Sequence, residues 1–92
     1  MIRSFRCRDT EALFRGKVPA RFRAIERAAR RKLEMLHAAV RIEDLRVPPG
    51  NRLHRLGGDR AGQWSIRVND RFRICFRWED GDAHDVELVD YH

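Results

Sequence analysis

Residues 64–78 read WSIRVNDRFRICFRW, and this stretch decides the fold. Apolar and polar residues alternate on both sides of Asn69-Asp70, a pair that is typical of a tight hairpin turn. Successive side chains of a β-strand point to opposite faces, so the alternation predicts two antiparallel strands with one apolar and one polar face. The predicted apolar face carries Trp64, Ile66, Phe72, Ile74 and Phe76.

The segments around this hairpin extend the sheet. Residues 53–56 predict a short strand before it, and residues 84–91 predict a last strand that follows a turn at residues 79–82. Near the N-terminus, residues 2–5 also alternate between apolar and polar side chains and predict a short first strand. The sheet is therefore expected to have four or five strands, most of them antiparallel.

Two helices are predicted between the first strand and the hairpin. Residues 9–11 begin a short helix that Gly16 ends, and Pro19 stands at the first position of a second helix. Apolar residues of the second segment recur at steps of three and four, which is the 3.6-residue period of a helix over about five turns. These residues are Phe22, Ile25, Ala29, Leu33, Leu36 and Val40. Residues 47–51, with two prolines and a glycine, predict a loop.

The order of these elements defines the fold class. The apolar faces of the strands must be covered, and the two helices are the available cover. We therefore expect an α+β two-layer sandwich, with two N-terminal helices packed on one face of a mostly antiparallel sheet. A chain of 92 residues corresponds to one small domain, spanning residues 1–92, and has no room for a doubly wound sheet or a large barrel.

The charge distribution favours a phosphate-bearing partner. The formal net charge is +6, and 18 of the 20 basic residues are arginine, which binds phosphate bidentately. Residues 79–92 hold six acidic residues and no lysine or arginine, so residues 1–78 carry a local charge of +12. Cys7 and Cys75 predict reduced thiols in a cytoplasmic protein, and no apolar run approaches the roughly 20 residues of a membrane span.

The polar face of the predicted hairpin is rich in arginine. Arg67, Arg71, Arg73 and Arg77 all alternate with the apolar residues and are expected to project away from the helices. One interpretation is an RNA-binding surface, because a polyanion would relieve the repulsion between these like charges. The other is a solvated face whose arginines pair with Asp85 and Glu87 on the next strand.

The long helix carries a second group of arginines. Arg23, Arg27, Arg30 and Arg31 fall near one of its faces, with Glu26 as an i,i+4 partner for Arg30. Arg23, Arg27 and Arg30 would add phosphate contacts to a large RNA, or this face is simply solvated.

The remaining polar residues suit the cleavage of RNA. The sequence has no zinc, calcium or nucleotide-binding motif, so we expect neither a metal site nor a cofactor. Histidine, tyrosine, aspartate and arginine can deprotonate a 2′-hydroxyl, protonate the leaving 5′-oxygen and neutralise the phosphoryl oxygens. Asp90, Tyr91 and His92 follow a hydrophobic strand, and Asp90 shares the parity of Val86 and Leu88, so it is alternatively an inward structural anchor.

Several short motifs together resemble the HigB-type toxins of the RelE-like toxin–antitoxin superfamily. The resemblance covers nearly the whole chain and includes the N-terminal Ile2-x-Ser4-Phe5. The other motifs are Arg52-Leu53-His54-Arg55-Leu56, Gly57-x-x-x-x-Gly62-x-Trp64-Ser65, Val68-Asn69, Arg73-Ile74-x-Phe76, Asp85-Val86 and Val89-Asp90-Tyr91-His92.

The resemblance implies a RelE-like fold and a ribosome-dependent endoribonuclease that cleaves messenger RNA during translation. It implies an active-site group of His54, Asp90, Tyr91 and His92, with Arg73 on the scissile phosphate. His54 or His92 would be the general acid and base, Tyr91 would stack on or orient the nucleobase, and Asp90 would orient a histidine or tyrosine.

The resemblance also implies a partner, a helix-turn-helix antitoxin of the HigA type that inhibits the toxin and binds operator DNA. Two other functions remain open at this point. They are a non-catalytic RNA-binding module that uses the arginine-rich face, and a regulatory subunit that binds the antitoxin.

Overall fold

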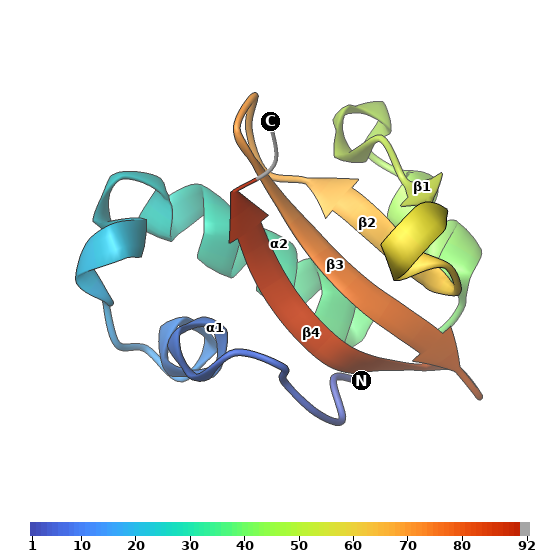
Figure 1. Ribbon diagram of the computed structural model, residues 1–92, viewed down its shortest axis with the longest axis horizontal. Coiled ribbons are helices and arrows are strands. Elements are labelled where there is room, and N and C mark those ends of the chain that lie inside the picture. Colours follow the sequence, from blue (N-terminus) through green and yellow to red (C-terminus); the bar gives the residue numbers. More distant parts are fainter. Residues whose placement is uncertain (91–92) are drawn as a thin grey trace.

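An antiparallel sheet with the strand order β1-β2-β3-β4 forms one layer of the protein, and helices α1 and α2 lie against one of its faces (Figure 1). The computed structural model describes residues 1–90. The strands are β1 (His54–Arg55), β2 (Gln63–Arg67), β3 (Phe72–Glu79) and β4 (Asp82–Asp90). The predicted α+β two-layer sandwich is confirmed.

The hairpin of β2 and β3 has the register that its alternation predicts. Trp64 lies opposite Phe76 and Ile66 lies opposite Ile74, so the apolar residues share a face. The side-chain oxygen of Asn69 accepts hydrogen bonds from the backbone N–H groups of Arg71 and Phe72, both at 2.8 Å, and this closes the turn. The two strands are therefore locked in one register by their turn as well as by their ladder.

The N-terminal segment is not a regular strand. Within the described residues it joins the sheet through two isolated parallel bridges, between Ile2 and Ala83 and between Phe5 and Val86. The irregularity matches a bulge in β4, where Asp85 has a positive φ of 53° and its backbone N–H donates to Ser4 Oγ. The bulge interrupts the regular spacing that a longer parallel ladder needs.

The helical region is more broken than the apolar period predicts. Helix α1 (Arg8–Phe14) ends before Gly16, whose φ of 98° favours glycine. Residues predicted to form one long helix instead form a 3₁₀ helix, η1 (Ala20–Ile25), and then helix α2 (Glu26–Ala38). At the junction, the backbone of Ile25 departs from helical geometry, with φ −117° and ψ 10°.

The prediction that the apolar stripe of the long helix extends to Val40 was wrong. Phe22, Ala29, Leu33 and Leu36 are buried, but Val40 lies beyond α2 and is 72% exposed. The carboxylate of Asp44 accepts hydrogen bonds from the backbone N–H groups of Val40 and Arg41, at 2.9 and 3.0 Å. These bonds begin the 3₁₀ helix η2 (Ile42–Arg46) and turn the chain away from the helix axis.

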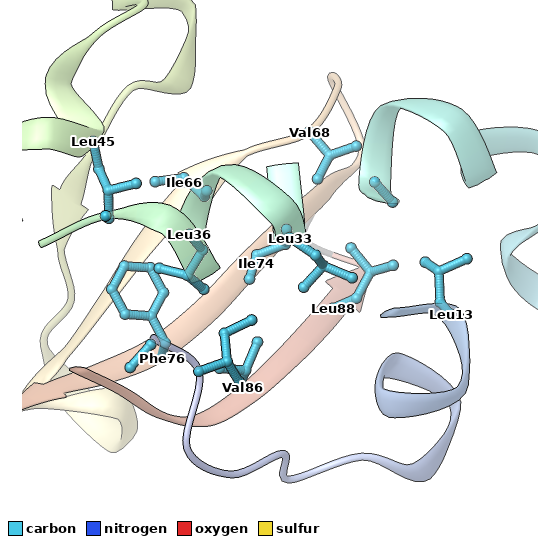
Figure 2. Packing of buried hydrophobic residues seen from close by; sticks show 14 of the residues in the cluster. Leu13, Leu33, Leu36, Leu45, Ile66, Val68, Ile74, Phe76, Val86 and Leu88 are labelled. Atoms are coloured by element: carbon cyan, nitrogen blue, oxygen red, sulfur yellow. The ribbon is translucent and has the colours of Figure 1, made fainter. Parts of the chain in front are cut away.

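Two further 3₁₀ helices, η3 (Pro49–Asn51) and η4 (Gly58–Arg60), lie in segments expected to be loops and turns. The apolar faces of α2, β2, β3 and β4 meet in one hydrophobic cluster (Figure 2). Its fully buried members include Leu13, Leu33, Leu36, Leu45, Ile66, Ile74, Phe76 and Val86.

Within residues 1–90, no helix combines the length and apolar character needed to cross a membrane.

Replacing Leu33 by alanine tests this core. Leu33 is fully buried, so Leu33→Ala is expected to lower the free energy of unfolding by about 2–5 kcal/mol through lost burial and the cavity it leaves. Val40→Ala, at the stripe position that the structure places outside the core, should change it by less than about 0.5 kcal/mol. Urea unfolding of both variants measures this. Similar losses for the two would contradict the helix end at Ala38.

Candidate functional site

A pocket of about 580 Å³ opens beside the end of β1, next to β2 and its hairpin. We call it the β1–β2 pocket. It is lined by Arg52, Leu53, His54, Leu56, Arg67, Asn69, Asp70 and Arg73. It exists because β1 is two residues long, whereas β2 runs on to Arg67. Arg52, two residues before His54, has a left-handed backbone with φ 46° and ψ 53°.

The pocket brings together two residues predicted to act in catalysis. His54 and Arg73 come from β1 and β3, the two strands that flank β2, and both line the pocket. His54 is exposed and lies opposite Ser65 in the ladder. A histidine and an arginine at one pocket supply a proton-transfer group and a cation for a phosphate.

The guanidinium of Arg73 is held by two hydrogen bonds. Its Nε donates to Ser65 Oγ and its Nη2 donates to the backbone carbonyl oxygen of Arg52, both at 2.8 Å. Both acceptors are neutral, so these two bonds orient the guanidinium without neutralising it.

A buried asparagine fixes the segment that supplies the second acceptor. Asn51 is fully buried, and its side-chain nitrogen donates to the carbonyl oxygen of Leu45 at 3.1 Å. Its side-chain oxygen accepts a hydrogen bond from Lys32 Nζ. Burial lowers the pKa of Lys32, and the nearby cations Arg31 and Arg67 lower it further. Lys32 therefore joins α2 to the segment that precedes the pocket and adds to its positive charge.

Arg67 also lines the pocket, but it has an acidic partner there. Its Nη2 pairs with a carboxylate oxygen of Asp70, three residues further along the chain. The Asp70 side chain is 99% exposed, so water screens this pair strongly. A phosphate entering the pocket would compete with Asp70 for Arg67.

The other two arginines of the hairpin do not line the β1–β2 pocket. Arg77 donates to Asp85 at 2.8 Å and to Glu79 at 2.5 Å, and its hydrogen bond to Asp85 holds the pKa of that carboxyl below its usual value. Arg71 lies against Asp90 and over the ring of Phe72. The pairing of Arg77 with Asp85 matches the alternative interpretation of the open face, in which its arginines pair with acidic residues of the next strand. RNA binding by Arg71 and Arg77 stays a prediction.

Asp90 and Arg71 belong to a second, smaller pocket, which we call the edge pocket. It is lined by Arg21, Phe22, Arg71, Phe72, Leu88 and Asp90. Asp90 lies opposite Phe72 in the ladder and accepts from Arg71 Nε at 2.9 Å. Phe22 packs edge-on against Phe72, so this pocket lies on the helix side of the sheet. Asp90 lies on the same side of the sheet as Leu88, as its parity predicts, but its side chain is exposed and its role stays a prediction.

The arginines of the helical region divide into two kinds. Arg23 and Arg27 are exposed and line a third pocket, the η1–α2 pocket, together with Asn69. Arg30 instead holds the fold together: it pairs with Glu26 at 2.6 Å and donates to the backbone carbonyls of Leu13 and Lys17 at 3.0 and 2.8 Å. The predicted pairing of Arg30 with Glu26 is confirmed. The bonds of Arg30 to the two carbonyls connect α2 to α1 and to the segment that follows α1.

The acidic residues of β4 pair with basic residues from several segments. Asp82 pairs with Arg3, Asp85 with Arg77, and Glu87 with Arg60. Exposed arginines also lie at η1 and α2, where Arg23 and Arg27 line the η1–α2 pocket. The β1–β2 and η1–α2 pockets share Asn69.

Tyr91 and His92, predicted to belong to the catalytic group, lie outside the described residues. No role was predicted from the sequence for Ser65, the Arg52 backbone, Lys32 or Asn51. Ser65 alternates with the arginines, so its parity indicated an exposed face, yet it is fully buried. No local pattern marks Asn51, because its partners are backbone carbonyls and a lysine distant in sequence.

The fold and this pocket define a class of small α+β proteins with a cationic pocket on an antiparallel sheet. The chain matches the model of a protein family described as the RelE-like toxin of the type II toxin–antitoxin system HigB, over residues 14–92. It therefore belongs to the HigB-like toxin family, and the sequence resemblance is confirmed.

Individual relatives agree with this assignment. The chain is 53% identical over 65 residues to "Toxin HigB-1" of Vibrio cholerae, covering 71% of this chain and 68% of that protein. It is 36% identical over 94 residues to "Endoribonuclease HigB" of Proteus vulgaris, covering both chains completely. It is also 38% identical over 58 residues to an uncharacterised protein of Haemophilus influenzae, covering 63% of this chain and 57% of that protein.

Replacing Arg30 by methionine separates its structural bonds from any RNA contact. Arg30→Met keeps much of the aliphatic chain but removes the donor to two backbone carbonyls, so we expect a loss of about 1.5–3 kcal/mol in the free energy of unfolding. Arg27→Met, one turn away and exposed, should change it by less than about 0.5 kcal/mol. Chemical denaturation measures both, and equal stability of the two variants would refute the role given to Arg30.

Proposed function

We propose that this protein is a toxin that acts as an endoribonuclease, cleaving translated messenger RNA on the ribosome without a catalytic metal ion. The observation that carries the proposal is the meeting of His54 and Arg73 in the β1–β2 pocket. The name of the full-length relative from Proteus vulgaris, an endoribonuclease, supports the same activity.

The chemistry follows from the substrate as much as from the site. In RNA, the 2′-hydroxyl is itself the nucleophile: a base removes its proton, the O2′–P bond forms and the P–O5′ bond breaks. An acid then protonates the leaving 5′-oxygen. The products are a 2′,3′-cyclic phosphate and a 5′-hydroxyl, so no serine or cysteine nucleophile is required and DNA is not a substrate.

The residues of the pocket fit separate roles in this step. Arg73 would neutralise the charge that develops on the phosphoryl oxygens, because its guanidinium is held at the pocket. His54 would transfer a proton, with His92 as the second member of the acid–base pair. By the family resemblance, Tyr91 would stack on or orient the nucleobase, and Asp90, which pairs with Arg71, would orient a histidine or tyrosine.

The surface around the pocket supports a longer contact with RNA. Arg67 lies inside the β1–β2 pocket, and Arg23 and Arg27 line the neighbouring η1–α2 pocket. Because Asn69 lines both pockets, an RNA strand in one would continue across the hairpin into the other. These arginines would bind backbone phosphates, and their contribution should weaken as the salt concentration rises.

Membership of a type II toxin family implies an antitoxin partner. We propose that this partner is a helix-turn-helix protein of the HigA type, and that the toxin meets operator DNA solely through it. The ribosome and messenger RNA would be the other partners, which places the protein in the cytoplasm.

Mapping of RNA ends on translating bacterial ribosomes tests the activity. The wild-type protein should produce new ends within the translated message. Arg73→Ala should lower the cleavage rate by about 100-fold or more, because the charge opposite the phosphoryl oxygens is lost. His54→Ala and His92→Ala should lower it by about 100- to 10,000-fold.

Arg55→Ala is the matched control for these variants. Arg55 adjoins His54 but lies opposite Trp64, with its guanidinium 5.6 Å from the centre of that ring. Arg55→Ala removes one positive charge, as Arg73→Ala does, but from the other face of the sheet, so cleavage should persist. Salt-sensitive RNA binding without new ends would instead support an RNA-binding module. Binding of the antitoxin without RNA binding and without RNA cleavage would support a regulatory subunit.

Asp70 gives a prediction in the opposite direction. Asp70→Asn removes the carboxylate that pairs with Arg67 at the pocket. Binding of a cleavage-resistant 2′-O-methyl RNA oligonucleotide should become about 1.5- to 5-fold tighter, in line with the strength of an exposed ion pair. Asp59→Asn makes the same charge change at an exposed position of η4. If fluorescence titration finds the same gain for both, Asp70 has no specific effect on Arg67.

A further inference from the structure

We propose that Ser65 is a positioning residue that aims Arg73 at the scissile phosphate. The inference rests on the proposed endoribonuclease activity and adds a residue to it. Ser65 Oγ accepts the hydrogen bond from Arg73 Nε at 2.8 Å, and Ser65 itself does not line the β1–β2 pocket. Its effect on catalysis would therefore pass through Arg73 alone.

The place of Ser65 in the sheet makes it suited to this role. It stands on β2 between His54 of β1 and Cys75 of β3, which are its two partners in the ladder. Ser65 and Cys75 are fully buried although they alternate with arginines. Arg73 is the diagonal neighbour of Ser65, and its side chain reaches across the ladder to the hydroxyl. The sheet thus fixes the acceptor rigidly.

The chemistry of the acceptor matters as much as its place. A carboxylate at position 65 would orient Arg73 in the same way but would also repel a phosphate. The Ser65 hydroxyl orients the guanidinium without adding a negative charge beside the phosphoryl oxygens.

A second neutral acceptor completes the arrangement. The Arg52 carbonyl oxygen binds Nη2 of Arg73, so Ser65 and Arg52 together hold the edge of the guanidinium formed by Nε and Nη2. Two bonds on one edge of a planar group fix both its position and its plane. Because Arg73 lines the β1–β2 pocket, a phosphate there would meet a guanidinium whose orientation these two bonds fix.

Kinetics of three variants test the proposal. Ser65→Ala removes the acceptor without adding volume, and it should lower kcat by about 10- to 100-fold with little change in KM, because misplacement affects the transition state most. Ser65→Thr restores the hydroxyl and should recover much of the rate. Ser4→Ala is the matched control: Ser4 Oγ accepts from the Asp85 backbone at 2.9 Å, away from the pocket, and kcat should not change.

A spectroscopic measurement decides the matter independently of activity. The Arg73 Nε–H signal in a ¹H–¹⁵N spectrum is identified by its disappearance in Arg73→Lys. Its hydrogen exchange should become about 10-fold faster in Ser65→Ala but remain unchanged in Ser4→Ala. If Ser65→Ala shows unaltered exchange of the Arg73 Nε–H and the same kcat as Ser4→Ala, the role of Ser65 is overturned. A wild-type protein that does not cleave RNA would overturn the proposed function, while the exchange measurement would still show whether Ser65 holds Arg73.

Discussion

The antiparallel ladder between β2 and β3 is the constraint on which the rest of the structure depends. It pairs Trp64 with Phe76 and Ile66 with Ile74, and this gives α2 an apolar surface to cover. The same register places Ser65 and Arg73 on the other face. A slip of one residue would reverse both faces at once. The core and the candidate site are therefore two consequences of one register, and neither could change without the other.

Ion pairing explains how a strongly basic chain produces a local site. The acidic residues of β4 pair with arginines of other segments, including Arg77 of β3 and Arg60 of η4. Two neutral oxygens, of Ser65 and Arg52, orient Arg73 at the β1–β2 pocket. The partners that orient each arginine, and not the number of arginines alone, therefore shape the pocket.

The sequence predicted those parts of the structure that depend on local periodicity. Alternation at residues 64–78 gave the correct faces for the core, because burial of apolar side chains enforces a period of two. The helical period correctly predicted the buried residues Phe22, Ala29, Leu33 and Leu36, but not the 3₁₀ helix η1 that precedes α2. It did not predict where α2 ends, because Asp44 turns the chain through bonds to the backbone of Val40 and Arg41.

The candidate site was predictable in part for the same reason. The motifs containing His54 and Arg73 identified two residues that meet in one pocket. The pairing of Arg71 with Asp90 was not predicted, since it joins residues far apart in the chain at the edge of the sheet. Ser65 and Asn51 were missed because their roles depend on contacts between distant segments, which leave no period in the sequence.

Cleavage of a message with a single 2′-deoxy nucleotide at a mapped cut site tests the central claim most directly, namely attack by the RNA's own 2′-hydroxyl at the pocket of His54 and Arg73. The all-ribose message should yield an upstream fragment ending in a 2′,3′-cyclic phosphate and a downstream fragment beginning with a 5′-hydroxyl, and the deoxy substitution should abolish that cut. Persistent cleavage at the deoxy position, leaving a 5′-phosphate, would show that water is the nucleophile and would contradict the account.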